Sequence, residues 1–428
     1  MSASPGSQGP PAPDGDLAPL PPGQRVATLD VLRGFALLGI LLVNIELFRG
    51  PALYDLLAGA EPALSAGEEA VSFLVGWLAG GKFLSSFAIL FGIGAAVIAA
   101  RAEARGHAAR GLLAKRYAWL LVFGLVHMLL LFAGDILFVY GIAGLLLLPF
   151  AQARVRTLLW WAGGILAVYL VLVVGFTALG AALEGAAPQQ ADDPVTAAVE
   201  GFFAERAEQA VTAYTEGGLG DQLQARAWEA LLVQSGQVLL APWVLALFLL
   251  GFAVGKAGVL ADLSAHRRLL RRTALIALPL GLLANVPVGF AGALGGAAVG
   301  PDADVSGLAL VGASAGQILG APVLAVGYLS ALALLCQRPA VLAWLAPLRD
   351  AGRMALSGYV LQSVLAAGLF TGFGLGVGLY GQVDGVQALA VVAGIWAVLL
   401  LVSTLWQRRL GRGPLERLWR RLTYGRVR

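Results

Sequence analysis

Long apolar stretches separated by short polar segments make up most of this sequence of 428 residues. A stretch of about 20 apolar residues is long enough to cross the hydrocarbon core of a bilayer as a helix. The pattern predicts about ten such spans, at approximately 28–48, 82–102, 116–134, 135–152, 156–182, 235–258, 270–296, 308–336, 355–378 and 386–406. We therefore expect an all-α fold, a polytopic transmembrane helix bundle.

The more polar segments divide the chain further. Residues 1–24 are rich in Pro, Gly, Ala and Ser without an apolar run, which indicates a disordered tail and not a signal peptide. Residues 51–80 are expected to lie along the outer interface or to form a re-entrant element. The resulting parts are a cytoplasmic tail (1–24), an N-terminal transmembrane core (25–182), an extracytoplasmic segment of one or two amphipathic helices (183–230), a C-terminal transmembrane part (231–406) and a basic cytoplasmic tail (407–428).

Composition agrees with a membrane protein. Charged residues make up 13% of the chain and hydrophobic residues 59%, with a mean hydropathy of +0.81, whereas soluble domains carry about 25% charged residues. The net charge of +4 comes from basic residues in short loops beside the spans, an orientation signal that argues against nucleic-acid binding. It predicts a bacterial inner-membrane protein with both termini in the cytoplasm. One cysteine, Cys336, and three histidines indicate neither an internal disulfide nor a metal site.

The clearest candidate for chemistry is His127, inside the predicted span 116–134. An ionisable side chain within a span is costly and is a functional candidate by default, although a satisfied core histidine is the alternative. Arg116 lies eleven residues earlier, about three turns or 16 Å away on the same face. Asp135 follows by eight residues, about 12 Å along the same helix, so it cannot directly orient His127 if the helix continues straight. Gly134-Asp135 predicts a tight turn, with Asp135 capping the next span or facing an outward cavity.

The first predicted span carries Asp30 and Arg33 three residues apart, and Asn44 shares a face with Arg33. Asp30 and Arg33 have two interpretations. In the first, Asp30 is a helix-start residue and the Arg33 side chain snorkels to the interface. In the second, Arg33 holds the phosphates of a cytoplasmic ligand.

Two further groups of polar residues lie in predicted spans. Lys82, with Ser85 and Ser86, forms a stripe near the outer surface, where Lys82 is expected mainly to anchor the interface. Ser357, Tyr359, Gln362 and Ser363 form another group, with Gln362 expected to be buried. Such groups predict either a polar cavity or hydrogen bonds between helices.

Five stretches carry a family resemblance. They are RVATLDVLRGFALLGILLVN (25–44), GKFLSSFAILFGIG (81–94), LLAKRYAWLLVFGLVHMLLLFAGDILFVYGIAGLLLLPF (112–150), GRMALSGYVLQS (352–363) and GPLERLWRRLTYG (413–425). Together they resemble the YeiB-like family of bacterial inner-membrane proteins, the domain-of-unknown-function 418 group, over nearly all of the chain after residue 25. One departure is Ser357-Gly358-Tyr359, where the family leads us to expect Thr-Asn-Tyr.

Through its first span this family is similar to transmembrane acyltransferases, which include the bacterial type 3 acyltransferases and the lysosomal heparan-glucosaminide acetyltransferase. The shared element is L-D-x-x-R-G, here Leu29 to Gly34. Type 3 enzymes place a catalytic histidine at the position of Asn44, whereas the heparan enzyme resembles this chain in having asparagine there. His127 is then the intramembrane candidate for the catalytic histidine.

The resemblance implies transfer of an acyl group from cytoplasmic acyl-CoA to a hydroxyl or amine of a carbohydrate, lipid or small metabolite. His127 would act with Asn44 and Gln362 as catalytic residues, while Arg33, Arg116 and Asp30 would hold acyl-CoA. Lys82, Ser86, Asp135 and Tyr359 would line a polar cavity. No permanently bound cofactor is expected, and a homo-oligomer is possible. A small-molecule transporter, with His127 carrying a proton, and a non-catalytic scaffold remain as alternatives.

Overall fold

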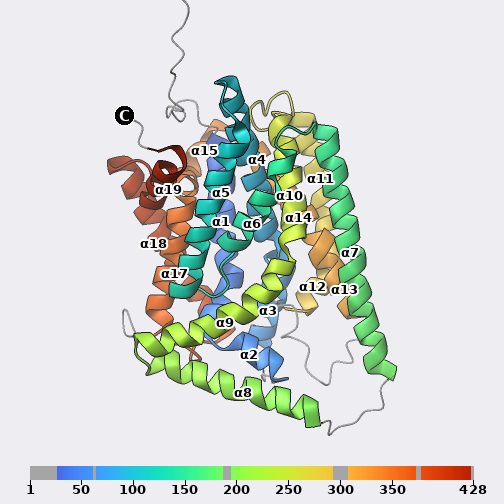
Figure 1. Ribbon diagram of the computed structural model, residues 1–428, viewed down its shortest axis with the longest axis vertical. Coiled ribbons are helices and arrows are strands. Elements are labelled where there is room, and N and C mark those ends of the chain that lie inside the picture. Colours follow the sequence, from blue (N-terminus) through green and yellow to red (C-terminus); the bar gives the residue numbers. More distant parts are fainter. Residues whose placement is uncertain (1–26, 61–63, 187–193, 293–306, 373–376, 426–428) are drawn as a thin grey trace, which may run out of the picture.

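The computed structural model describes residues 27–60, 64–186, 194–292, 307–372 and 377–425, so the tail predicted at 1–24 lies outside the described residues. Within those ranges the chain is all-helical, as predicted, and Figure 1 shows a bundle of helices with two helices lying across one end. The main helices are α1 (Ala27–Arg49), α2 (Ala52–Leu57), α3 (Ala66–Leu78), α4 (Lys82–Ala104), α5 (Ala109–Leu130), α6 (Leu137–Leu146), α7 (Val155–Ala186), α8 (Pro194–Thr215), α9 (Leu219–Leu239), α10 (Ala241–Lys256), α11 (Arg267–Ala284), α12 (Val286–Phe290), α13 (Gly307–Ala315), α14 (Ala321–Leu335), α15 (Pro339–Trp344), α16 (Ala346–Arg353), α17 (Ala355–Phe370), α18 (Gly385–Arg409) and α19 (Pro414–Tyr424).

Six stretches of described helix are long and apolar enough to cross a membrane: Ala27–Arg49, Ala66–Ala104, Ala109–Leu130, Val155–Leu183, Gly307–Leu335 and Gly385–Arg409. Two bent pairs, α9 with α10 at 54° and α16 with α17 at 93°, raise the number to at most eight. The predicted count of about ten spans is therefore not confirmed. The predicted span 135–152 is one reason, because α6 has only 10 residues, about 15 Å of helix against a hydrocarbon core of about 30 Å.

The segment 51–80 contains two helices. Ser65 starts α3 with a capping box, in which its hydroxyl accepts from the Glu68 backbone and Glu68 reaches back to the Ser65 backbone N–H. Gly81, in the left-handed region at φ +74°, makes the turn into α4. Because α3 and α4 together form the long apolar stretch Ala66–Ala104, α3 is part of the bundle and not a helix lying along its surface.

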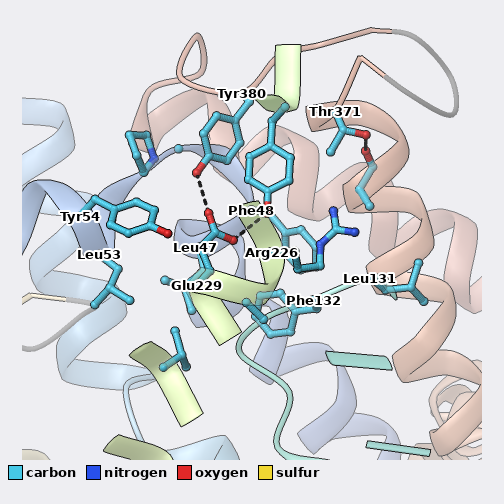
Figure 2. A pocket seen from close by; sticks show the side chains of 16 residues that line it. Leu47, Phe48, Leu53, Tyr54, Leu131, Phe132, Arg226, Glu229, Thr371 and Tyr380 are labelled. Carbon is cyan, nitrogen blue, oxygen red and sulfur yellow. Dashed lines mark hydrogen bonds between the residues drawn. The ribbon is translucent and has the colours of Figure 1, made fainter. Parts of the chain in front are cut away.

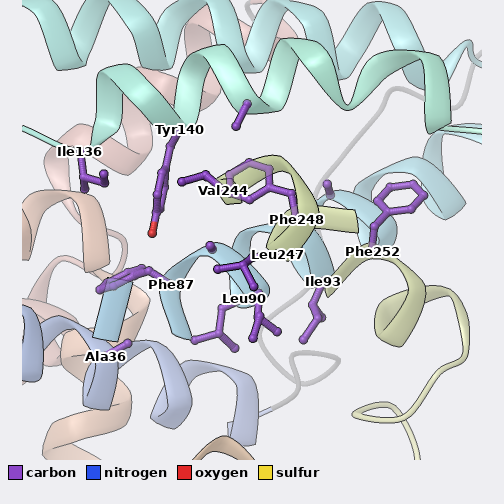
Figure 3. Close-up of a cluster of buried hydrophobic side chains, with 14 of the residues drawn as sticks. Ala36, Phe87, Leu90, Ile93, Ile136, Tyr140, Val244, Leu247, Phe248 and Phe252 are labelled. Carbon is purple, nitrogen blue, oxygen red and sulfur yellow. The ribbon is translucent and has the colours of Figure 1, made fainter. Parts of the chain in front are cut away.

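The hydrophobic core lies where α4 and α10 pack together. Phe87, Leu90 and Ile93 of α4 meet Val244 and Phe248 of α10, as Figure 3 shows. Tyr140 of α6 closes the same cluster, with its ring centroid 5.3 Å from that of Phe248 and its hydroxyl donating to the Leu84 carbonyl. The short helix α6 is thus held inside the bundle.

The two helices predicted in the polar segment 183–230 are present as α8 and α9, which lie across the end of the bundle opposite α15 and α19 (Figure 1). Helix α9 is tied to the chain that follows α5. The Arg226 guanidinium donates to the Leu130 carbonyl, and the Gln234 amide donates to the Ala133 and Asp135 carbonyls. These bonds fix the loop that holds Asp135.

Candidate functional site

The site is built around the end of α5. The helix ends at Leu130, and the Leu131 and Phe132 amides both donate to the His127 carbonyl as the chain turns back. The turn brings Asp135 beside His127, with 2.8 Å between Asp135 Oδ1 and His127 Nδ1. The other carboxylate oxygen accepts from the Phe138 backbone N–H and so begins α6. Gly124 leaves room for this return, because a Cβ there would meet Phe138 and the Asp135 carboxylate.

Asp135 would miss His127 only if the helix continued straight, and this condition is not met. Helix α5 ends at Leu130, four residues before Gly134, and the chain turns back. The tight turn at Gly134-Asp135 and the capping role of Asp135 were correct in outline. Both side chains are buried, with His127 3% exposed and Asp135 0% exposed, so the pair is shielded from solvent on every side.

The second imidazole nitrogen of His127 faces α17. Its Nε2 lies 2.9 Å from Ser363 Oγ, and the His127 ring packs against the Tyr359 ring with centroids 4.9 Å apart. An ionised carboxylate only accepts hydrogen bonds, so Asp135 holds the proton on Nδ1 and leaves Nε2 able to accept from Ser363. Asp135, His127 and Ser363 thus form a continuous hydrogen-bonded chain in the interior.

A cavity of about 340 Å³ leads from the α19 end of the bundle toward this chain. Its deep wall is apolar and aromatic, and includes Phe87, Ile136, Tyr140 and Tyr359. The buried Tyr359 hydroxyl lies near Asp135 but makes no hydrogen bond of ordinary geometry. The outer wall is charged instead, and carries Asp30, Arg33, Arg101, Arg116, Arg353 and Glu416.

The charged side chains of the cavity are held in place by one another and by α19. Asp30 pairs with Arg33 at 3.2 Å and with Arg353 at 3.3 Å. The Arg116 guanidinium stacks on the Trp419 ring at 3.5 Å, and the Trp419 indole donates to the Arg116 carbonyl. Four arginines against two carboxylates leave an excess of positive charge around a partly open cavity, a setting that suits phosphate groups.

Glycine brings the helices of this cavity together. A Cβ at Gly34 of α1 would meet the Leu348 carbonyl, and one at Gly352 of α16 would meet the Asp30 carbonyl. Only glycine permits so close a crossing of two helices. The crossing places Arg353, the next residue of α16, against Asp30.

A second, smaller pocket of about 30 Å³ lies on the other side of His127, at the α8–α9 end. Phe132, whose ring centroid is 6.4 Å from that of His127, and Ala367 of α17 contribute to its wall. Figure 2 shows Glu229 at its centre, where it accepts hydrogen bonds from the Tyr214 hydroxyl at 2.7 Å and the Tyr380 hydroxyl at 3.4 Å. His127 and Ser363 thus lie in the wall between two pockets that open from opposite ends.

The Glu229 network is satisfied internally. Burial and the Glu229 carboxylate raise the pKa of the Tyr214 and Tyr380 hydroxyls well above the ordinary value, so both stay protonated and donate. Arg226, which stacks near Tyr214 at 5.4 Å, brings a positive charge to the same pocket. This pocket therefore has little free space, and its polar groups already bond one another.

The structure brings together only part of the predicted site. Asp30, Arg33, Arg116 and Tyr359 line one cavity, and His127 with Asp135 lies beyond its deep wall. Four other predicted site residues line neither pocket: Asn44, Lys82, Ser86 and Gln362. Gln362 is buried as expected and donates to the Leu37 carbonyl, so it joins α17 to α1.

Lys82 does not anchor the outer interface as expected. Its side chain is 0% exposed, and its ammonium group donates to the Gly76 carbonyl at 2.7 Å. Helix α3 runs on into α4 as one apolar stretch, and the last turn of α3 supplies the carbonyl that the Lys82 ammonium group contacts, so a position that the sequence pattern places at the surface is enclosed. Ser86 bonds the Lys82 carbonyl within its own helix, so the predicted stripe is a structural feature of the α3–α4 turn.

Among the residues of the site that were not predicted to belong to it are Arg101, Arg353 and Ser363. In the sequence, Arg101 and Arg353 could be interpreted only as basic loop residues that set the orientation of the chain in the membrane. Ser363 was visible within a polar group on one span, but its partner His127 lies 236 residues away. No local pattern indicates which helix that face of α17 meets.

Comparison with known proteins shows the family of this chain. Residues 254–426 match the family described as "Protein of unknown function (DUF418)". The uncharacterized protein YxaH of Bacillus subtilis is 30% identical over 95% of this chain and 96% of its own length. The chain belongs to the YeiB-like DUF418 family. The uncharacterized protein YeiB of Escherichia coli is 29% identical over 94% of this chain and 96% of its own length.

A third relative of this YeiB-like chain is an uncharacterized 39.9 kDa protein from Bacillus acidopullulyticus, 28% identical over 96% of this chain and 97% of its own length. No solved structure matches. The family resemblance found in the sequence is confirmed, and the chain is an integral membrane protein of an uncharacterised family. The matched region 254–426 contains α17 and α19, whereas His127 and Asp135 lie outside it.

Proposed function

We propose that this protein is an integral membrane acyltransferase that takes an acyl group from acyl-CoA and passes it to a hydroxyl or amine acceptor. The observation that supports this most strongly is the buried His127, oriented by Asp135 and lying beyond a cavity whose outer wall carries four arginines. The arginine end faces the cytoplasm, where acyl-CoA is made.

The cavity suits the two parts of acyl-CoA. Arginine guanidinium groups bind phosphate oxygens bidentately, and Arg33, Arg101, Arg116 and Arg353 line the entrance. Along α5, Arg116 and His127 are eleven residues apart, about 16 Å, which fits an extended pantetheine arm. The apolar deep wall then receives the thioester and the acyl chain.

His127 supplies the proton transfer that acyl transfer requires. With Asp135 on Nδ1, its Nε2 is free to accept a proton from a nucleophile, and general base catalysis of this kind contributes about 10²–10⁴ in rate. The acceptor, a carbohydrate, lipid or small metabolite, approaches through the smaller pocket on the far side of His127.

The first test is binding. Acetyl-CoA and longer acyl-CoAs should raise the thermal stability of the purified protein in detergent, because a ligand that binds only the folded state stabilises it. Arg33→Ala should lose this shift. Arg272→Ala, which removes an exposed arginine of α11 outside the cavity, is the matched control and should retain it.

The second test is turnover. His127→Ala should lower acyl transfer by about 10²–10⁴ while the thermal shift with acyl-CoA remains. Full turnover in this variant would contradict the proposal.

Two pockets separated by His127 also suit a small-molecule transporter, in which the wall between them opens alternately and His127 carries a proton. Uptake or efflux in proteoliposomes without acyl-CoA would favour this function. A protein that shows no shift with any acyl-CoA and does show flux would replace the acyltransferase with the transporter.

A further inference from the structure

Ser363 is a buried hydroxyl that the proposed function does not yet use. It lies on α17, is 2% exposed, and completes the hydrogen-bonded chain from Asp135 through His127. We propose that Ser363 is the nucleophile that carries the acyl group between donor and acceptor, with His127 as its base and Asp135 as the positioning residue. This inference rests on the proposed acyltransferase function and specifies its mechanism.

The geometry matches the roles that a serine nucleophile needs. The imidazole is bonded on one nitrogen to a carboxylate at 2.8 Å and on the other to a hydroxyl at 2.9 Å. This order of acid, base and nucleophile recurs on unrelated folds and is recognised by its geometry, whatever the positions in the sequence. Here the three groups come from α5, the turn after it, and α17.

Comparison with other buried hydroxyls of the chain shows where the Ser363 proton is directed. Ser85 and Ser86 in α4, and Thr371 directly after α17, donate to the carbonyl four residues earlier at 2.7 Å, 2.9 Å and 2.8 Å. This is the usual way to satisfy a hydroxyl inside a span. In Ser363 the equivalent contact, to the Tyr359 carbonyl, is longer at 3.3 Å, while the contact to His127 is 2.9 Å. The proton therefore points to the imidazole.

The position of Ser363 also suits transfer from one pocket to the other. Tyr359, four residues before it, lines the arginine cavity, and Ala367, four residues after it, lines the smaller pocket. Ser363 is about 6 Å, one helical turn, from each. A group esterified to this hydroxyl can be loaded from the Tyr359 side and removed from the Ala367 side.

The reaction then has two balanced halves. In the first, Ser363 Oγ attacks the thioester carbonyl carbon, its proton passes to His127 Nε2, and the carbon–sulfur bond breaks. The proton then moves to the sulfur, and free CoA leaves. In the second, the acceptor hydroxyl or amine gives its proton to Nε2 and attacks the acyl carbon, and Ser363 Oγ leaves and takes the proton back.

The Tyr359 hydroxyl has a place in both halves. Tyr359 lines the cavity, its ring packs against His127, and its buried hydroxyl, which lies near Asp135, makes no hydrogen bond of ordinary geometry. A donor placed where negative charge develops on the carbonyl oxygen lowers the barrier. Tyr359 is therefore the group that stabilises this oxygen.

The test uses the first half-reaction, which needs no acceptor. The purified full-length protein is incubated with acetyl-CoA labelled on the acetyl group, denatured, and assayed for bound label. We expect a stoichiometric ester on the peptide that contains Ser363, located by peptide mass spectrometry and released by hydroxylamine. Label on another residue, or no covalent label in a protein that turns over, would overturn the proposal.

Variants separate this inference from the function on which it rests. Ser363→Ala should lose labelling and transfer but keep the thermal shift with acetyl-CoA, and Ser363→Cys should carry a thioester instead. Ser403→Ala, at an equally buried serine of α18 that lines neither pocket, is the matched control and should label normally. Transfer at the normal rate in Ser363→Ala would refute the nucleophile yet leave the acyltransferase. No binding and no transfer in the unaltered protein would refute both.

Discussion

The two ends of the molecule hold pockets of opposite character. At the α19 end, a cavity of about 340 Å³ carries four arginines and two carboxylates around its outer wall. At the α8–α9 end, a pocket of about 30 Å³ surrounds Glu229, which already accepts from two tyrosine hydroxyls. One end has space and excess charge, whereas the other has neither.

This difference indicates that the pocket at the α19 end is suited to bind a ligand, whereas the pocket at the α8–α9 end is closed by its own contacts. An excess of positive charge around an open cavity is suited to a ligand that brings the opposite charge. A buried carboxylate whose partners are protein hydroxyls instead stabilises the packing around it. We therefore expect the donor side to be preformed. The acceptor side must loosen its contacts between α2, α8 and α9 before a molecule larger than water enters.

The largest effect is expected in the wall between the pockets. Asp135→Asn keeps the size of the side chain but presents a donor or a neutral acceptor to His127 Nδ1, which permits the wrong imidazole tautomer. Acyl transfer should fall by about 10⁴, measured as turnover with a fixed acceptor. Acyl-CoA binding by thermal shift should not change, and a loss of binding would show that Asp135 serves the cavity instead.

A smaller effect is expected at the arginine cavity. Arg116→Ala removes a charge that faces the cavity, and a hydrogen bond to a charged group contributes about 1.5–3 kcal/mol, roughly 10- to 150-fold in the dissociation constant for acyl-CoA. The measurement is a titration with acyl-CoA and with the matching acyl-pantetheine, which lacks the nucleotide phosphates. Only the CoA form should lose affinity. An equal loss for both would mean that Arg116 acts through Trp419 packing and not through phosphate.

The smallest effect is expected at the opposite pocket. Glu229→Gln keeps the shape but weakens the acceptor for Tyr214 and Tyr380, which should cost about 1–3 kcal/mol in the free energy of unfolding. Thermal or denaturant unfolding measures the change. Acyl-CoA affinity should stay the same, and if it fell with Glu229→Gln, the two pockets would be coupled and the contrast between the two ends would fail.

Much of the fold can be predicted from the pattern of apolar residues, and the errors of that prediction have physical causes. A run of apolar residues predicts a buried helix, but it does not say whether the helix is long enough to span. Residues 136–151 form an almost entirely apolar run, yet the helix that Asp135 begins has only 10 residues and is enclosed by α5, α4 and α10. Likewise Lys82 is buried although it starts a helix, and its ammonium group donates to the Gly76 carbonyl in the last turn of α3. The pattern of apolar residues does not show that the bundle encloses this junction.

For the candidate site, too, the sequence predicts some features and misses others. His127 could be found because an imidazole within a span is costly, and Asp30, Arg33 and Arg116 because charge lies near the expected membrane surface. The bond between His127 and Asp135 depends on where α5 ends, and the bond to Ser363 on how α17 packs against α5. Both are properties of the packed bundle, and helical periodicity alone predicts neither.

The bond between His127 and Ser363 joins residues 236 positions apart, one in each half of the chain. Neither half can then be inherited, duplicated or exchanged as an independent functional module. If the gene is divided between the codons for residues 187 and 193, so that the membrane receives the two halves as separate polypeptides, acyl transfer should return only when both are made in the same cell. An inactive His127→Ala half paired with an intact partner should not complement. Genetically, the site is a single functional unit whose parts are encoded by two separate stretches of the gene.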